Sequence, residues 1–371
     1  MKRSGILAIR IELSVLLTVS AMLWADPPQR QKDLTASIQA LPLLSEPTKG
    51  TIEADWLVYP TKIPTGIYRT ENLKELVLTN GLISRTFRLV PNAATVAMDN
   101  HITGQSMVRG VKPEATVELD GLPFEIGGLK GQPNYAFLLP EWINMLTSDP
   151  TAFQIKNISV EKTQAPFPWK RTRYNSQSIW PPAGIALRLD FSLPSASEPN
   201  APQAFPANER ARLIQEKVHL KDVTFSVYYE MYDGIPVLCK WIEMQNGSER
   251  PVKLNSFKSE ILALVEGESP VDDSPIWMPL NIHAESDYEF GGMTAAGANK
   301  TCLWVPDPEY KTQVNYRCQT PCMLVSALPK GPDITIKPGD KFVSFRTYEL
   351  LYDSSDRERR GLSLRHMYRT V

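Results

Sequence analysis

Four Asn-Gly or Asp-Gly dipeptides separate short runs of alternating apolar and polar residues, and they constrain the fold of this chain most. They are Asn80-Gly81, Asp120-Gly121, Asp233-Gly234 and Asn246-Gly247. Such pairs favour tight hairpin turns because both residues readily take positive φ. Asp233-Gly234, for example, stands between an alternating run at 223–231 and a second run at 237–244. The pattern predicts an all-β chain and disfavours a helical or βαβ protein.

The composition supports one large domain. The chain has 371 residues, of which 42% are hydrophobic, so it can close a core between packed sheets. Its 31 prolines and 20 glycines suit a chain that reverses direction often. The amino-acid composition does not shift along the chain in a way that marks a second domain, and we predict one large antiparallel sandwich over residues 51–353. The net charge of −1 argues against nucleic acid and anionic lipid as partners.

The N-terminus has the pattern of an export signal. A basic start precedes an apolar stretch at 13–24, and Ala25 offers a small residue for cleavage. An uncleaved anchor is the alternative, but the stretch is shorter than the ~20 residues that a spanning helix needs. We therefore predict a signal peptide at 1–25 and a secreted or periplasmic protein without membrane attachment. Residues 26–50 are polar with several prolines, which predicts a disordered tether.

The four cysteines predict no metal site. Cys302, Cys318 and Cys322 cluster in the sequence, while Cys239 lies in a strand-like run. Their spacing differs from that of zinc sites, and no histidine lies among them. One disulfide within the cluster would fit an oxidising compartment; buried free thiols are the alternative. No motif indicates a cofactor.

Helix is predicted at two places. Residues 140–146 begin with proline and could form two turns. Residues 354–371 are predicted to form a linker helix, because Ser355 and Glu358 have the spacing of a capping box. This helix is rich in arginine and could dock a catalytic barrel domain or a hydrolase subunit, or it could simply be solvated. The docking candidates are Arg357, Arg360 and Arg365.

The sharpest polar constellation is His283, Glu285 and Asp287. If this segment is a strand, the three side chains share one face, because side chains alternate with period two. Such a row could bind sugar hydroxyls, hold a cation or act as an acid–base pair. The alternative is the solvated face of a strand.

Tryptophans in loops form the second candidate site. Several lie beside prolines or in turns, where a ring could stack on a sugar; Trp180 and Trp277 are the carbohydrate-contact candidates. The alternative is that each ring fills space under a loop. The sequence contains no nucleophile elbow, Walker loop, dinucleotide fingerprint or His-Glu-x-x-His motif.

The chain from residue 56 onward resembles the N-terminal β-supersandwich of α-galactosidase-type glycoside hydrolases of family 36. The resemblance rests on the segments 78–87, 229–236 and 345–351. It implies a galactose-mutarotase-like supersandwich fold. In such enzymes the catalytic aspartates lie on a barrel that follows the sandwich, and this sequence stops at Val371 before such a barrel. The resemblance therefore implies no catalytic residue here, and predicts a carbohydrate-associated module that does not cleave bonds itself.

Two other functions stay open at this point. One is a mutarotase-like or lyase-like enzyme with its site on the sandwich, in which His283 and Glu285 would be the acid–base candidates. The other is an interaction protein whose C-terminal helix docks on a separate hydrolase subunit.

Overall fold

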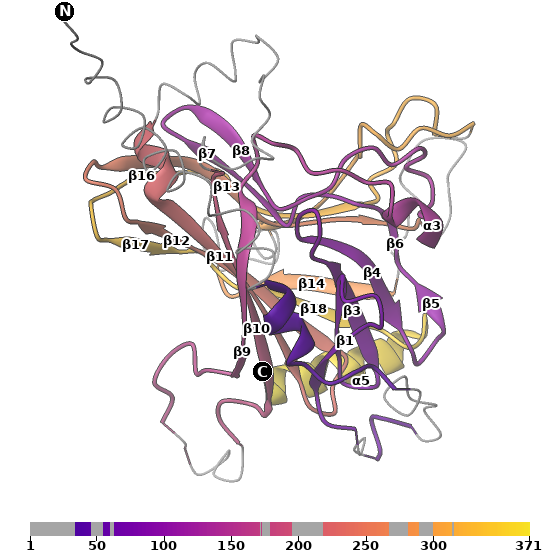
Figure 1. Cartoon of the computed structure of the whole chain (residues 1–371). Coiled ribbons are helices and arrows are strands. Elements are labelled where there is room, and N and C mark those ends of the chain that lie inside the picture. Colours follow the sequence, from indigo (N-terminus) through magenta and orange to yellow (C-terminus); the bar gives the residue numbers. More distant parts are fainter. Residues whose placement is uncertain are drawn as a thin grey trace, which may run out of the picture.

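The computed structural model describes residues 34–45, 55–59, 63–170, 172, 179–194, 218–266, 281–288, 300–313 and 315–371. Within them the named strands pair antiparallel in three sheets, and a helix closes the chain (Figure 1). The predicted large antiparallel β-sandwich with a short C-terminal helix is therefore confirmed. The predicted signal peptide at 1–25 lies outside the described residues.

The three sheets combine hairpins of neighbouring strands with pairings between segments far apart in the sequence. The five-stranded sheet has the order β1 (Gly66–Arg69), β2 (Glu75–Thr79), β3 (Ile83–Arg88), β4 (Ala94–Asn100) and β5 (Gln105–Ser106). The seven-stranded sheet has the order β14 (Ile282–Ser286), β18 (Thr347–Leu351), β12 (Val237–Asn246), β11 (Val223–Tyr232), β10 (Gly184–Ser192) and β9 (Gln154–Lys162), with β17 (Lys341–Val343) also paired to β12. The six-stranded sheet has the order β15 (Cys302–Val305), β16 (Met323–Ile336), β13 (Val252–Leu264), β7 (Ala115–Leu119) and β8 (Leu122–Ile126), with β6 (Val108–Gly110) also paired to β13.

Three of the four turn dipeptides form the hairpins that they predict. The fourth, Asn246-Gly247, connects β12 to β13, which lie in different sheets and do not pair. β2 pairs with β3 across Asn80-Gly81, and Gly81 has a φ of 81°. Asp120 and Gly121, with φ of 48° and 78°, connect β7 to β8. β11 pairs with β12 across Asp233-Gly234. Positive φ at the turn twists the two strands in the sense that an antiparallel pair requires.

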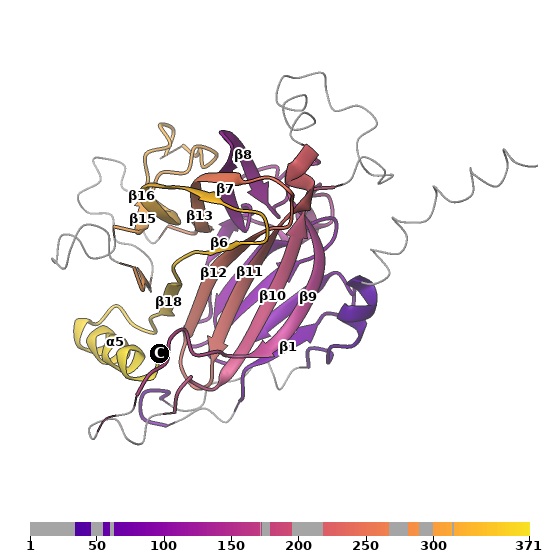
Figure 2. The ribbon, with the colours of Figure 1, turned by 90° about the vertical axis from the view of Figure 1, so that its left-hand side faces the viewer.

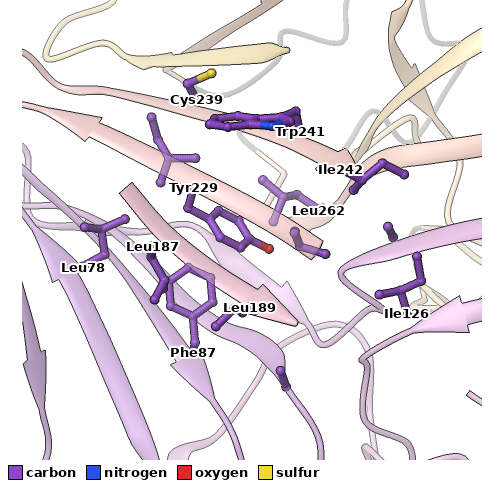
Figure 3. Close-up of a cluster of buried hydrophobic side chains, with 14 of the residues drawn as sticks. Leu78, Phe87, Ile126, Leu187, Leu189, Tyr229, Cys239, Trp241, Ile242 and Leu262 are labelled. Atoms are coloured by element: carbon purple, nitrogen blue, oxygen red, sulfur yellow. The ribbon is translucent and has the colours of Figure 1, made fainter. Parts of the chain in front are cut away.

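Aromatic rings fill the interfaces between the sheets. Phe87 of β3 lies against Tyr229 of β11 with ring centroids 4.6 Å apart, so the first sheet covers the inner face of the seven-stranded sheet (Figure 3). Phe153 packs edge-on against Phe225 of β11 and against Phe124 of β8, at 4.9 and 5.7 Å. One continuous core therefore joins all three sheets.

The opposite face of the seven-stranded sheet, here called the outer face, carries the alternate residues. Figure 2 looks onto this face, with the strands of the first sheet behind it and helix α5 (Arg357–Thr370) to one side. Tyr228 and Glu230 of β11 and Trp241 of β12 project from it, because their neighbours in the sequence point into the core.

Three local expectations need correction. Residues 34–45, predicted as part of a disordered tether, are ordered: residues 34–39 are helical, and Leu34 and Ile38 are buried in the core. The first predicted helix is shorter than expected and spans Pro140–Ile143 (α3). The last helix is capped by Asp356, not by Ser355, because the Asp356 carboxylate accepts a hydrogen bond from the backbone N–H of Arg359 at 2.8 Å. A single turn of 3-10 helix (η2) occupies Val218–Asp222.

All four cysteines are free thiols. Cys239, Cys302 and Cys322 are buried, and Cys318 is half-buried. Burial raises the pKa of Cys302 to about 12, so this thiol stays protonated at neutral pH. Among the described helices, none has the length and apolarity to span a bilayer.

Candidate functional site

A cleft of ≈ 470 Å³ lies at the edge of the outer face. Its walls come from β14 and β18, from the C-terminal end of α5, and from residues 166–169 and 179–180 between β9 and β10. Five aromatic residues line it: Phe167, Trp169, Trp180, Tyr348 and Tyr368. Glu285 and Asp287 are its acidic groups, and Arg369 is its basic group.

The carboxylate of Glu285 is held by two neighbours. The Nε2 atom of His283, two residues earlier on β14, lies 2.9 Å from Oε2. The Tyr368 hydroxyl of α5 donates a hydrogen bond to the same oxygen at 2.8 Å. Burial and the adjacent Glu285 raise the pKa of Tyr368, so the hydroxyl keeps its proton as a donor. The two contacts fix the carboxylate on the cleft wall and tie the helix to the sheet.

Asp287 follows the end of β14 and is fixed by backbone contacts. Its N–H donates to the carbonyl of Arg346 at 3.1 Å, and its Oδ1 accepts from the N–H of Arg346 at 2.8 Å. Partial burial raises the pKa of Asp287. The carboxyl therefore has a fixed position at the mouth of the cleft.

The aromatic wall is a cluster of three rings. Trp180 lies 5.3 Å from Phe167 and 5.5 Å from Trp169, measured between ring centroids. Phe167 is 54% exposed, so the cluster offers ring surface to the solvent side. Rings at such separations support one another in tilted arrangements.

The structure brings most of the sequence-predicted site residues together. Glu285, Asp287 and Trp180 line one cleft, and His283 contacts Glu285 from the same strand face. Trp277 lies outside the described residues. Sequence reasoning missed Tyr348 and Tyr368, because tyrosines at the end of a sheet strand and on a helix carry no local pattern that marks a shared cleft.

The arginines of α5 divide into two groups. Arg357 and Arg365 are exposed, as the docking hypothesis requires. Arg360 turns inward instead: it donates to the carbonyl of Ser354 at 3.0 Å and to Oδ1 of Asn281 at 2.6 Å, and it lies 5.1 Å from the ring of Tyr352. These contacts hold the helix on the sandwich, so Arg360 is not free to dock a partner.

A buried charge cluster, which the sequence did not reveal, lies between the sheets. It consists of Arg85, Glu114, Lys240, Glu260 and Glu349, each at most 1% exposed. Arg85 and Lys240 each donate to Glu260 at 2.8 Å. Lys240 also donates to the Glu114 carbonyl at 2.6 Å, and Arg85 lies 3.5 Å from Glu349. The cluster joins β3, β12, β13 and β18.

The cluster contains three carboxyl groups and two cations, so a neutral interior requires one bound proton. Burial and the adjacent Glu260 raise the pKa of Glu349 well above its ordinary value. Burial also opposes ionisation of Glu260, but Arg85 and Lys240 outweigh it and lower its pKa to about 2. The proton therefore resides on Glu349. Because these side chains have almost no solvent contact, the cluster is an internal contact between the sheets and does not form an open site.

Among the described residues, no three His, Cys, Asp or Glu side chains converge in a way that could hold a metal ion. The cleft combines ring faces with fixed hydrogen-bond acceptors. Such an arrangement can bind a small polar ligand that also has an apolar face.

Comparison with known proteins gives likenesses in structure alone. No family model and no curated protein sequence matches the chain. The fold is similar to that of the family 36 α-galactosidase AgaB from Geobacillus stearothermophilus, with 9% identity and a TM-score of 0.37 over 78% of this chain and 41% of that chain.

Two further solved structures have similar values. An α-galactosidase from Lactobacillus brevis is 7% identical with a TM-score of 0.40, over 80% of this chain and 42% of that one. A proposed aldose 1-epimerase from Klebsiella pneumoniae is 9% identical with a TM-score of 0.38, over 80% of this chain and 84% of that one. The chain spans about two fifths of the length of the α-galactosidases that it matches.

Proposed function

We propose that the protein binds carbohydrate and that the cleft beside α5 holds a sugar ring. The observation that carries this proposal is the joint presence of five aromatic residues and two carboxylates in one cleft of ≈ 470 Å³. The apolar face of a pyranose can stack on an aromatic ring, while its hydroxyl groups donate to fixed carboxylates. The volume lies within the range of about 300–1,000 Å³ that small-molecule sites occupy.

The two carboxylates suit binding better than glycosidic bond cleavage. Glycosidases place two carboxyl groups so that they flank the scissile bond. Glu285 and Asp287 instead come from successive outward positions at the end of one strand, so they lie on the same wall of the cleft. We therefore propose a module that holds a saccharide without cleaving it. Its association with an α-galactosidase-like catalytic domain or subunit, and its export, stay predictions.

Isothermal titration against a panel of galactosides and plant oligosaccharides tests the proposal. We expect saturable binding, and we expect Trp180→Ala to weaken it by at least about tenfold, or 1.4 kcal/mol. Trp142→Ala is the matched control, because Trp142 also lies against a phenylalanine, Phe137, at 5.2 Å but outside the cleft. Absence of binding across the panel, or equal losses in the two variants, would contradict the proposal.

A second function is favoured by one observation, the contact of 2.9 Å between His283 and Glu285. A histidine in contact with a carboxylate is a pair of side chains that general acid–base enzymes use, including enzymes that act on sugars. Assays of mutarotation and of glycoside cleavage test this function. Turnover that is unchanged in both His283→Ala and Glu285→Gln would exclude the pair as the acid and base.

A further inference from the structure

A row of side chains crosses the outer face of the seven-stranded sheet next to the cleft. Trp241 of β12 is the register partner of Tyr228 of β11, and Tyr228 is the partner of Arg188 of β10. Arg346 precedes β18 by one residue and lies 4.0 Å from the centre of the Trp241 ring. We call Arg346, Trp241, Tyr228 and Arg188 the cross-strand row.

The members of the row hold one another rigidly. The rings of Trp241 and Tyr228 are stacked, with centroids 4.6 Å apart and an interplanar angle of 4°. The guanidinium of Arg188 hydrogen bonds with Tyr228 and donates to Asp190 at 3.1 Å. Trp241 is buried at 5% exposure, whereas Tyr228 and Arg188 are partly exposed. The row therefore holds the Tyr228 hydroxyl and the Arg188 guanidinium in fixed positions.

One end of the row lies beside a residue that lines the cleft. Asp287, which lines the cleft, makes two hydrogen bonds with the backbone of Arg346. Its Oδ1 accepts from the Arg346 N–H at 2.8 Å, and its own N–H donates to the Arg346 carbonyl at 3.1 Å. With strands about 4.8 Å apart, the row extends about 14 Å from Arg346 to Arg188. Figure 2 shows β9 to β12 in front. Arg188 keeps 32% of its side chain exposed.

The chemistry around the row suits uncharged hydroxyl groups. Glu161 lies 3.6 Å from Arg188, and Glu243 and Asp190 are also partly exposed, so donors and acceptors alternate without a large net charge. A polyanion would gain little attraction from such a surface. Sugar hydroxyls, which both donate and accept, match it.

We propose that the ligand is a neutral oligosaccharide, with one unit in the cleft and further units along the cross-strand row. This inference rests on the proposed function, because it requires that the cleft itself bind a sugar. It assigns to Tyr228 and Arg188 the contacts to the units outside the cleft.

Titration with neutral galactosides, glucans and mannans of one to five units tests this inference. We expect the affinity to rise by at least about tenfold from one to several units, or 1.4 kcal/mol. Tyr228→Phe keeps the stack on Trp241 and removes the hydroxyl, and Arg188→Gln removes the charge. Each should reduce the gain with length while the affinity for a single unit stays unchanged. Trp180→Ala should weaken binding at every length.

The matched controls are Arg317→Gln and Tyr316→Phe. Arg317 lies 5.3 Å from the exposed ring of Tyr316, so this pair has the same side chains as Arg188 and Tyr228. It lies outside both the row and the cleft. Affinity that is independent of length, in a protein that binds a single unit, would overturn this inference and leave the proposed function intact. No binding at any length would overturn both. Equal effects of the row variants and the controls would also overturn the inference.

Discussion

Arg85 is a fully buried arginine whose charge is balanced inside the protein. It contacts Glu260 at 2.8 Å and lies near Glu349 at 3.5 Å. Moving an isolated charge out of water is costly, so a buried pair tolerates the loss of one partner poorly. The two glutamates differ, however: burial raises the pKa of Glu349, while Arg85 and Lys240 outweigh burial at Glu260 and lower its pKa, so we assign the shared proton to Glu349. Exchanging each of them for glutamine therefore tests the assignment.

Glu260→Gln should lower the free energy of unfolding at pH 7 by about 3–5 kcal/mol, because it leaves two buried cations without their shared carboxylate. Glu349→Gln replaces a neutral acid by an amide of similar shape and should lower the free energy of unfolding by less than about 1.5 kcal/mol. Urea denaturation measures both, with the exposed Glu71→Gln as the control. Equal losses at positions 260 and 349 would show that the proton is not on Glu349.

The same assignment predicts how stability depends on pH. The native state keeps a proton on Glu349 that the unfolded state loses above about pH 4.5, so the free energy of unfolding should fall as the pH rises from there, by up to about 1.4 kcal/mol per unit. Glu260 acts in the opposite direction: its contribution is present above about pH 4.5 and is lost as the pH falls toward about 2. Denaturation of Glu349→Gln between pH 4 and 8 should lack the decline at higher pH. Parallel curves for the two proteins would contradict this.

At the scale of elements, α5 is fastened to the sandwich through Arg359. Its guanidinium makes two hydrogen bonds of 2.8 Å to Asp55 and one of 2.6 Å to Asp353. The contact with Arg359 lowers the pKa of Asp55. Asp353 also accepts from the indole N–H of Trp56 at 2.8 Å. Since the end of α5 forms one wall of the cleft, this attachment also positions Tyr368.

Arg359→Lys should loosen the helix, because an ammonium cannot form the paired contacts of a guanidinium. We expect hydrogen exchange of the α5 amides to accelerate by about tenfold, or 1.4 kcal/mol of local opening. Arg365→Lys is the control, because Arg365 is exposed on the same helix. Identical exchange in the two variants would show that Arg359 does not hold the helix.

The short helix at 34–39 is a second element that the core depends on. Leu34 and Ile38 lie four residues apart, on one face of the helix, and are 5% and 0% exposed. Ile38→Ala should lower the free energy of unfolding by about 2–5 kcal/mol. The exposed neighbour provides the control, and Gln39→Ala should change stability by no more than about 0.5 kcal/mol. If Ile38→Ala left the free energy of unfolding unchanged, the segment would be a tether after all.

At the scale of the whole molecule, the sequence predicts local pairings and misses distant ones. The hairpins β2–β3, β7–β8 and β11–β12 follow from turn dipeptides between alternating runs, because such pairing needs only neighbouring residues. The central place of β13, which pairs with both β7 and β16, is set by side chains far apart in the sequence. No local pattern specifies that partnership.

The site shows the same division. The shared face of His283 and Glu285 follows from the period of a strand. Their aromatic neighbours come from the segment before β10 and from α5, and only the folded chain brings them together. Sequence reasoning missed Arg85 and Lys240 because a charged residue in an alternating run normally indicates the solvated face of a strand. Here both side chains point inward and are buried, because carboxylates on the other strands balance their charge.

The position of Arg85 has a consequence for the order in which the chain can close. The carboxylate nearest to it, at 2.8 Å, belongs to Glu260, which follows 175 residues later. Until the later segment exists, Arg85 lacks this hydrogen-bonded carboxylate and has only Glu114 nearby, at 3.7 Å, so we expect the early strands to pack over it less stably. Closure over such separations belongs to folding in milliseconds to seconds rather than microseconds. The hydrogen-bonded pair that completes this part of the interior therefore needs a residue from the last third of the polypeptide.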